Sequence, residues 1–236
     1  MTFPIDRIAM ALLLLACLGV GAANWLRDYP GSNPWAPLVL NEAPGWATGR
    51  KLGELRTDLA ACRAFLGRSD LPDVPLPATG SGACRMDDRR VLNIPALDFS
   101  PHHPQGTCGV DAALAWWLRH GVQPQAEAMF ASRVVRIEHL GTVNCRRIGN
   151  GSKGAWSEHA TGNAIDVSAF VLANGRRIVV KRDWKGGIED AAFLHAVRNE
   201  ACRSFATVLS PDYNAAHADH LHLDQANRVG GWKACH

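Results

Sequence analysis

The sequence SEHATGNAID, residues 157–166, and the sequence HADHLHLD, residues 217–224, carry the strongest structural signal in this chain. The first stretch places a histidine and an aspartate seven residues apart, and the second places a His-x-His pair roughly fifty residues later. Imidazole nitrogens and a carboxylate oxygen, without a thiolate, are the donors that a catalytic zinc ion takes. We therefore expect the two stretches to meet in one metal site.

The second stretch has the pattern of a half-buried strand. Polar and apolar residues alternate strictly from His220 to Asp224, so a strand would place His220, His222 and Asp224 on one face and both leucines in the core. Two histidines on one strand face lie roughly 6.5–7 Å apart. Both could bind one metal ion, or one could bind it while the other contacts the substrate.

The first stretch contains a turn, Thr161-Gly162-Asn163, that allows His159 and Asp166 to converge. Asp166 lies between two β-branched residues that should point into the core. A carboxylate in such a place is costly unless it is paired or metal-bound. The alternative to a metal ion is a salt bridge with Arg146 or Arg147.

Around these stretches, hydrophobic periodicity predicts helices and short strands in irregular order. The order indicates an α+β fold in which a small antiparallel sheet carries the metal site, packs against helices and is stapled by disulfides. We interpret Trp116 and Trp117 as core residues rather than as a sugar-stacking platform. The predicted helices span residues 50–66, 110–119, 125–131 and 188–205; Gly67 should end the first and Gly121 the second. The predicted strands span residues 91–97, 133–140, 164–172 and 177–181, and a turn at Asn174-Gly175 should join the last two.

The N-terminus predicts export. Residues 8–23 form an uncharged apolar run, which suits a signal peptide cleaved near Gly21-Ala22-Ala23 or an uncleaved signal anchor. A lipoprotein site at Cys17 is disfavoured because the apolar run continues past it. We favour the anchor, with residues 1–26 as signal, 27–49 as a proline-rich linker or surface-hugging segment, and 50–236 as a domain in the cell envelope, on the periplasmic side of the inner membrane or secreted to the periplasm.

Cysteine usage agrees with export. Beyond Cys17 the chain has six cysteines and no C-x-x-C pair, which favours three disulfides over a zinc ribbon or six reduced core thiols. We expect sequence neighbours to pair, which gives 62–84, 108–145 and 202–235. A formal net charge of +3 with no basic run argues against nucleic acid as a partner.

The motifs also resemble a known family. Cys145-Arg146, the pattern in 157–166 and His217-x-Asp219-His220-x-His222-x-Asp224 resemble the bacterial extensin-like C-terminal domain family over about residues 38–235. More distantly they are similar to the LAS-type peptidoglycan zinc metallopeptidases, which include D-Ala-D-Ala carboxypeptidases, VanX-type dipeptidases and MepA-type endopeptidases. The resemblance implies a zinc peptidase that acts on peptidoglycan peptides.

Carried over by position, the resemblance implies that His159, Asp166 and His222 are the zinc ligands. It implies that His220 moves protons or stabilises the transition state, with Asp219 and His217 as alternatives or supports. Arg146 would hold a substrate carboxylate, and Ser157 would hydrogen-bond the substrate backbone. Many relatives carry Glu where this chain has Asp219, so a non-catalytic wall-binding or scaffold domain that keeps the metal geometry is the alternative function.

Overall fold

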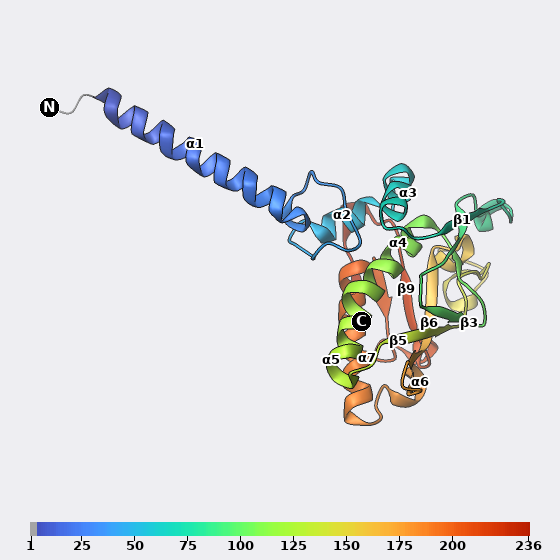
Figure 1. The fold of residues 1–236 in the computed structure, drawn as a ribbon. Helices are drawn as coiled ribbons and strands as arrows, with labels where there is room; N and C mark the ends of the chain where they lie inside the picture. The colour runs from blue at the N-terminus through green and yellow to red at the C-terminus, as the bar shows by residue number, and fades with distance from the viewer. Residues whose placement is uncertain (1–3) are drawn as a thin grey trace.

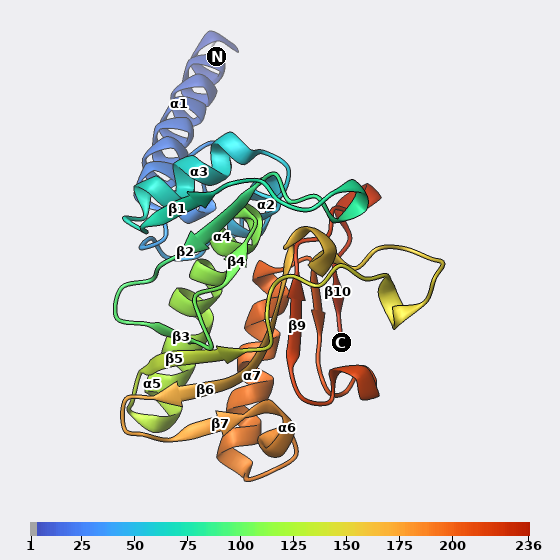
Figure 2. The same cartoon turned by 90° about the vertical axis from the view of Figure 1, so that its right-hand side faces the viewer.

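The structure of the protein is a computed structural model, which describes residues 4–236 (Figures 1 and 2). A seven-stranded sheet has the order β10-β8-β9-β6-β5-β3, with β7 paired to β6. Its pairs are antiparallel except β3–β5 and β8–β10, which are parallel. The strands are β3 (Asp98–Ser100), β5 (Val134–His139), β6 (Ala164–Leu172), β7 (Arg177–Val179), β8 (Thr207–Leu209), β9 (Leu221–Asp224) and β10 (Ala234–Cys235).

A second, three-stranded antiparallel sheet has the order β1-β2-β4. Helices α4 and α7 contact each other and pack beside the large sheet, as Figure 1 shows. The small sheet is β1 (Asp73–Leu76), β2 (Arg89–Leu92) and β4 (Gln105–Gly106), and the α-helices are α1 (Pro4–Asp28), α2 (Thr48–Glu54), α3 (Leu59–Arg68), α4 (Cys108–Trp117), α5 (Gln123–Phe130), α6 (Val180–Asp183) and α7 (Ile188–Ser204). The expected α+β fold is confirmed.

The core lies between the helices and one face of the large sheet. Ile165, Val167, Leu221 and Leu223 are fully buried on that face, as the strand alternation predicted. Trp117 packs edge-on against β6 through Phe170 and donates its indole N–H to Val197 O in α7 at 2.8 Å. Trp116 is also buried, at 4% exposed, so the interpretation of the tryptophan pair as core is confirmed.

Two helix boundaries differ from the sequence prediction. The predicted helix 50–66 is two helices, because Asp58 leaves helical geometry and its carboxylate caps α3 by accepting from Ala61 N at 2.9 Å. Gly121 does not stop the second helix, since α4 continues through a π-turn (Leu118–Val122) into α5. A Cβ on Gly121 would lie 2.7 Å from Glu200 Cβ. The glycine is needed for the close approach to α7.

Three disulfides are present, and two pairings differ from the expectation. Cys62 bonds Cys108, Cys84 bonds Cys145, and Cys202 bonds Cys235. The first bond joins α3 to α4, which pack together, and the second joins the segment before β2 to the loop that leads to the first motif. Only 202–235 is confirmed, because the partners are set by which elements pack together and not by separation along the chain.

Helix α1 projects away from the rest of the protein (Figure 1). Residues 5–28 are long and apolar enough to cross a membrane, and their most apolar 18-residue stretch has a mean hydropathy of 2.0. The following residues do not hang free, because Leu38 and Leu40 join the hydrophobic core. Among the residues described, the helix and the three disulfides are the features that favour a location outside the cytoplasm.

Candidate metal centre

Three side chains from the two motifs converge at one point. Nε2 of His159 lies 3.1 Å from Oδ1 of Asp166 and 3.1 Å from Nδ1 of His222, and the last two atoms are 2.9 Å apart. Their possible ligand atoms all lie within 4.8 Å of one another. The histidines are buried and Asp166 is partly exposed, so the group is accessible to solvent through Asp166.

His159 is positioned by a single turn of 3₁₀-helix, Glu158–Thr161. Ser157 caps this turn by accepting from His159 N at 3.3 Å, and Gly162 ends it in the left-handed region with φ +70°. That φ favours glycine over other residues. Asn163 then holds the turn against α4, since its Oδ1 accepts from Thr107 Oγ1 at 2.8 Å.

Strand pairing brings in the other two side chains. Asp166 of β6 lies directly opposite His222 of β9 in an antiparallel register. Such partners have their side chains on the same face of the sheet. The flanking apolar residues of both strands point to the core, which turns the carboxylate and the imidazole to the other face. The alternation of buried apolar residues therefore fixes the pairing register of β6 and β9, and this register places Asp166 beside His222.

The remaining nitrogen of each ring is already occupied. Nδ1 of His159 lies 3.1 Å from Thr142 O, a backbone acceptor, and Nε2 of His222 lies 3.1 Å from Asp224 Oδ2. When Nδ1 of His159 and Nε2 of His222 donate these bonds, the converging nitrogens keep their lone pairs. An outer carbonyl or carboxylate of this kind is the usual partner of a metal-binding histidine. The donor set therefore fits a divalent ion such as zinc.

The site is electrostatically polarised. Burial alone would raise the pKa of Asp166, but hydrogen bonds with His159 and His222 outweigh it and hold that pKa well below its usual range. Burial alone would lower the pKa of His222, but hydrogen bonds with Asp166 and Asp224 and their charges raise it to about 9. Asp166 and Asp224 thus bring two carboxylates to the site, which suits a cation.

His220 faces the same group without joining it. Its Nε2 lies 3.5 Å from Asp166 Oδ1, and its Nδ1 lies 2.8 Å from Asp219 Oδ1. Asp219 therefore orients the ring. The ring of the neighbouring His217 is tilted against the His220 ring, with 5.3 Å between their centroids, and its Nδ1 lies 2.8 Å from Asn214 Oδ1. Burial first, and then the charges of His220 and His222, lower the pKa of His217 to about 4, so it is neutral at neutral pH.

The two expected substrate contacts are placed differently. Ser157 is buried, and its hydroxyl is used in capping the turn of His159. Arg146 is half-buried, and its carbonyl accepts from Ser157 N at 3.1 Å, which ties it to the same turn. Its positive charge contributes to the lowered pKa of His217, so the guanidinium is close enough to that ring to interact with it electrostatically. Asp166 pairs with histidines and not with Arg146 or Arg147.

Comparison with known protein families gives one match. The family described as "Extensin-like protein C-terminus" matches residues 60–236. The chain belongs to this family. Every converging side chain of the extensin-like domain lies inside the matched residues, whereas α1 and the segment after it lie before them. No curated protein and no solved structure matches the chain.

Sequence reasoning missed two supports of the extensin-like site. Asp224 was expected on the same strand face as His222, but its contact with the ring was not expected. The strand alternation carried that signal. The contact of Thr142 is made by a backbone carbonyl, for which no sequence signal exists.

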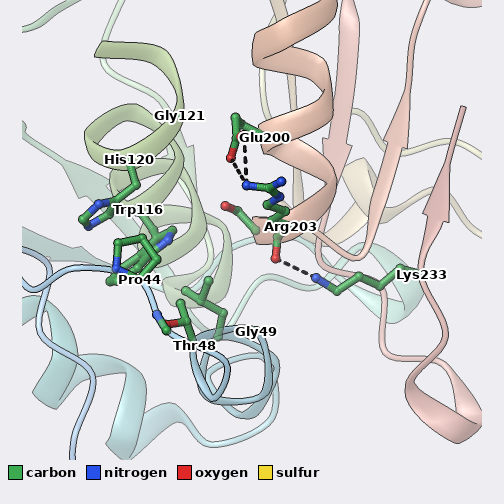
Figure 3. Close-up of a pocket in the computed structure, with 12 residues that line it drawn as sticks. Pro44, Thr48, Gly49, Trp116, His120, Gly121, Glu200, Arg203 and Lys233 are labelled. Atoms are coloured by element: carbon green, nitrogen blue, oxygen red, sulfur yellow. Dashed lines mark hydrogen bonds and ion pairs between the residues drawn. The ribbon is translucent and has the colours of Figure 1, made fainter. Parts of the chain in front are cut away.

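A cavity of about 480 Å³ elsewhere in the domain has none of these residues in its lining. Figure 3 shows that it lies between α2, α7 and the π-turn after α4, with Trp116 and His120 on one side and Glu200 and Arg203 on the other. The metal centre is therefore not part of this cavity.

Proposed function

We propose that the protein is a zinc-dependent peptidase of the cell envelope that hydrolyses peptidoglycan peptides, in cross-links or in stem peptides, and is related to the LAS-type metallopeptidases. The observation that carries the proposal is the convergence of His159 Nε2, Asp166 Oδ1 and His222 Nδ1 to within 3.1 Å of one another. His220 lies beside this group, with its Nε2 directed at it. Three protein donors with an open side are typical of catalytic rather than structural zinc.

The metal ion, when bound, supplies Lewis-acid polarisation of the scissile carbonyl and a water molecule of lowered pKa. His159, Asp166 and His222 would hold it. The outer contacts of Thr142 and Asp224 keep the two rings in the orientation in which the converging nitrogens face the ion.

His220 is the group that moves protons in this proposal. Its Nδ1 is held by Asp219, which fixes the ring, and its Nε2 is left facing the reacting position. A proton taken by Nε2 from water can be returned to the leaving amine from the same atom. His217 borders the same space as a neutral ring.

Arg146 supplies the positive charge that a substrate with a free carboxylate needs. Stem peptides carry such carboxylates. Ser157 contributes through the turn that it caps, which sets the position of His159. Membrane attachment through α1 would keep the reaction close to the inner membrane.

The test is digestion of purified sacculi and of soluble muropeptides by wild type, His222→Ala and His102→Ala, with zinc supplied and bound metal measured. His102 is an exposed histidine outside the site and serves as the matched control. We expect wild type and His102→Ala to release new amino termini, detected by mass spectrometry, and His222→Ala to release none. Equal inactivity of wild type and His222→Ala would reject the peptidase.

A second candidate is a non-catalytic wall-binding or scaffold domain that keeps the metal geometry. It is favoured by Asp219, which is one methylene shorter than the Glu expected there and is hydrogen-bonded to His220 rather than directed at the metal site. This candidate predicts that wild type sediments with sacculi and releases no peptide.

A further inference from the structure

Helix α1 has the dimensions of a membrane span. Its 25 residues extend about 37 Å at roughly 1.5 Å per residue, against about 30 Å for the hydrocarbon core of a bilayer. Its most apolar stretch is entirely unburied by the rest of the protein. When α1 crosses the bilayer, its last turn, with Trp25 and the adjoining Tyr29, lies at the membrane surface.

Exposed aromatic side chains continue past the end of this helix. We call residues 29–47 the collar. Trp35 is 81% exposed and Trp46 is 67% exposed. In the domain, Trp116, Trp117 and Trp184 are buried, whereas Trp156 and Trp232 are 40% and 59% exposed. Tryptophan favours the membrane–water interface, where its apolar ring and polar N–H are both satisfied. The end of the span and the collar thus carry a run of exposed aromatic side chains, which are Trp25, Tyr29, Trp35 and Trp46.

The collar is also close to the end of α1 in space. Arg27 and Asp28 line a shared hollow with Glu42, Ala43 and the residues up to Gly45. Trp46 follows directly. The two ends of the collar, with Tyr29 and Trp46, therefore lie beside the exit of the span.

The collar is built into the domain and is not a flexible tether. Lys51 Nζ donates to Pro30 O at 2.8 Å, and Ala47 N donates to Gly31 O at 3.2 Å. Gly31 lies so close to residues 43–45 that a Cβ on it would be 2.3 Å from Ala43 O and 2.8 Å from Gly45 N.

The middle of the collar is fixed to the helices of the domain. His120 Nε2 lies 2.7 Å from Leu40 O, and Leu40 itself is buried in the core. The leading end of the collar, at Pro30, and its middle, at Leu40, therefore both move with the domain.

We propose that the collar binds the surface of the lipid bilayer, with Trp35 and Trp46 inserted into the headgroup region of the membrane that α1 crosses. The occupant is the bilayer interface and not an anionic lipid in particular, because the collar has no basic cluster. A retained α1 and a rigid collar would hold the domain at one orientation on the membrane surface. The proposal does not depend on peptidase activity.

The test uses the full chain in phosphatidylcholine vesicles whose acyl chains are brominated either near the headgroup or deep in the core. Bromine quenches tryptophan fluorescence on contact. The double variant Trp35→Phe/Trp46→Phe is compared with Trp156→Phe, a matched exposed tryptophan in the extensin-like domain that is 40% exposed. All replaced side chains are exposed, so both proteins should fold.

We expect bromines near the headgroup to quench the tryptophan fluorescence of wild type and of Trp156→Phe strongly. In the double variant most of this quenching should be lost, and the part that is due to Trp25 should remain. Identical quenching of wild type and the double variant would reject binding of the collar to the bilayer, as would a cellular protein whose mass shows that it begins after Ala23. Chemical cross-links from the collar to a second copy, with no bromine effect, would instead make it an interface between copies.

Discussion

Nε2 of His222 lies 3.1 Å from Oδ2 of Asp224, two residues along the same face of β9. Asp224 is buried and its second oxygen accepts from Ala226 N at 2.9 Å, so the position of the carboxylate is fixed independently of its contact with the ring. This contact leaves Nδ1 of His222 for the metal centre. Asp224 is a positioning residue rather than a catalytic one.

Replacing Asp224 by Asn should weaken metal binding. The amide keeps one oxygen for Ala226 N but loses the charge that orients His222, and loss of such outer contacts raises the metal dissociation constant about 10–100-fold. Competition with a chromophoric chelator measures this. Asp87→Asn, at a side chain 70% exposed, is the control and should bind metal as wild type does. Equal affinity of Asp224→Asn and wild type would show that the contact is not needed.

Replacing His220 by Ala should separate metal binding from chemistry. The three converging donors remain, so metal content should stay at the wild-type level. Peptide release should fall about 10²–10⁴-fold, the usual contribution of a general acid–base group. Parallel assays of bound zinc and of released muropeptides check the two parts. Loss of the metal in this variant would make His220 a ligand instead.

Replacing Gly121 by Ala should destabilise the protein. The new Cβ would meet Glu200 Cβ at 2.7 Å and Trp117 Cδ1 at 3.0 Å, and overpacking of this kind costs about 1–3 kcal/mol in the free energy of unfolding. Gly49→Ala, in helix α2 with open space around it, is the matched control. It should be neutral or stabilising by up to about 1 kcal/mol. Urea unfolding of both variants measures the difference, and equal stabilities would contradict the close approach of the π-turn to α7.

Peptide mapping without reduction should recover Cys62 with Cys108 and Cys84 with Cys145. Removal of the second bond with Cys84→Ala/Cys145→Ala should lower the free energy of unfolding by about 4 kcal/mol, because the closed loop spans 61 residues. Calorimetry or urea unfolding checks the loss. A peptide that joins Cys62 to Cys84 would mean that α3 and α4 are not linked as described.

Much of the site could be predicted from sequence, because its signals are local. The alternation from His220 to Asp224 and the apolar neighbours of Asp166 predict which side chains point away from the core. Burial of the apolar residues between them allows only one pairing register of the two strands. The apolar run before Trp25 likewise predicted a signal peptide or a signal anchor, and the structure has one helix there that is long enough to cross a membrane. The turn at Gly162 was readable from residue type alone.

Other features were decided only by elements far apart in the chain. The disulfide partner of Cys62 could not be predicted from sequence. Disulfide pairing requires the two Cα atoms to be about 4.4–6.8 Å apart, and only the packing of α3 on α4 brings Cys108 that close to Cys62. Gly121 was read as a stop because its neighbour Glu200 was not visible in the sequence. Sequence determined which residues face the metal centre, through the two-residue period of its strands. Tertiary packing decided what supports them, since contacts such as Thr142 with His159 exist only after distant segments have folded together.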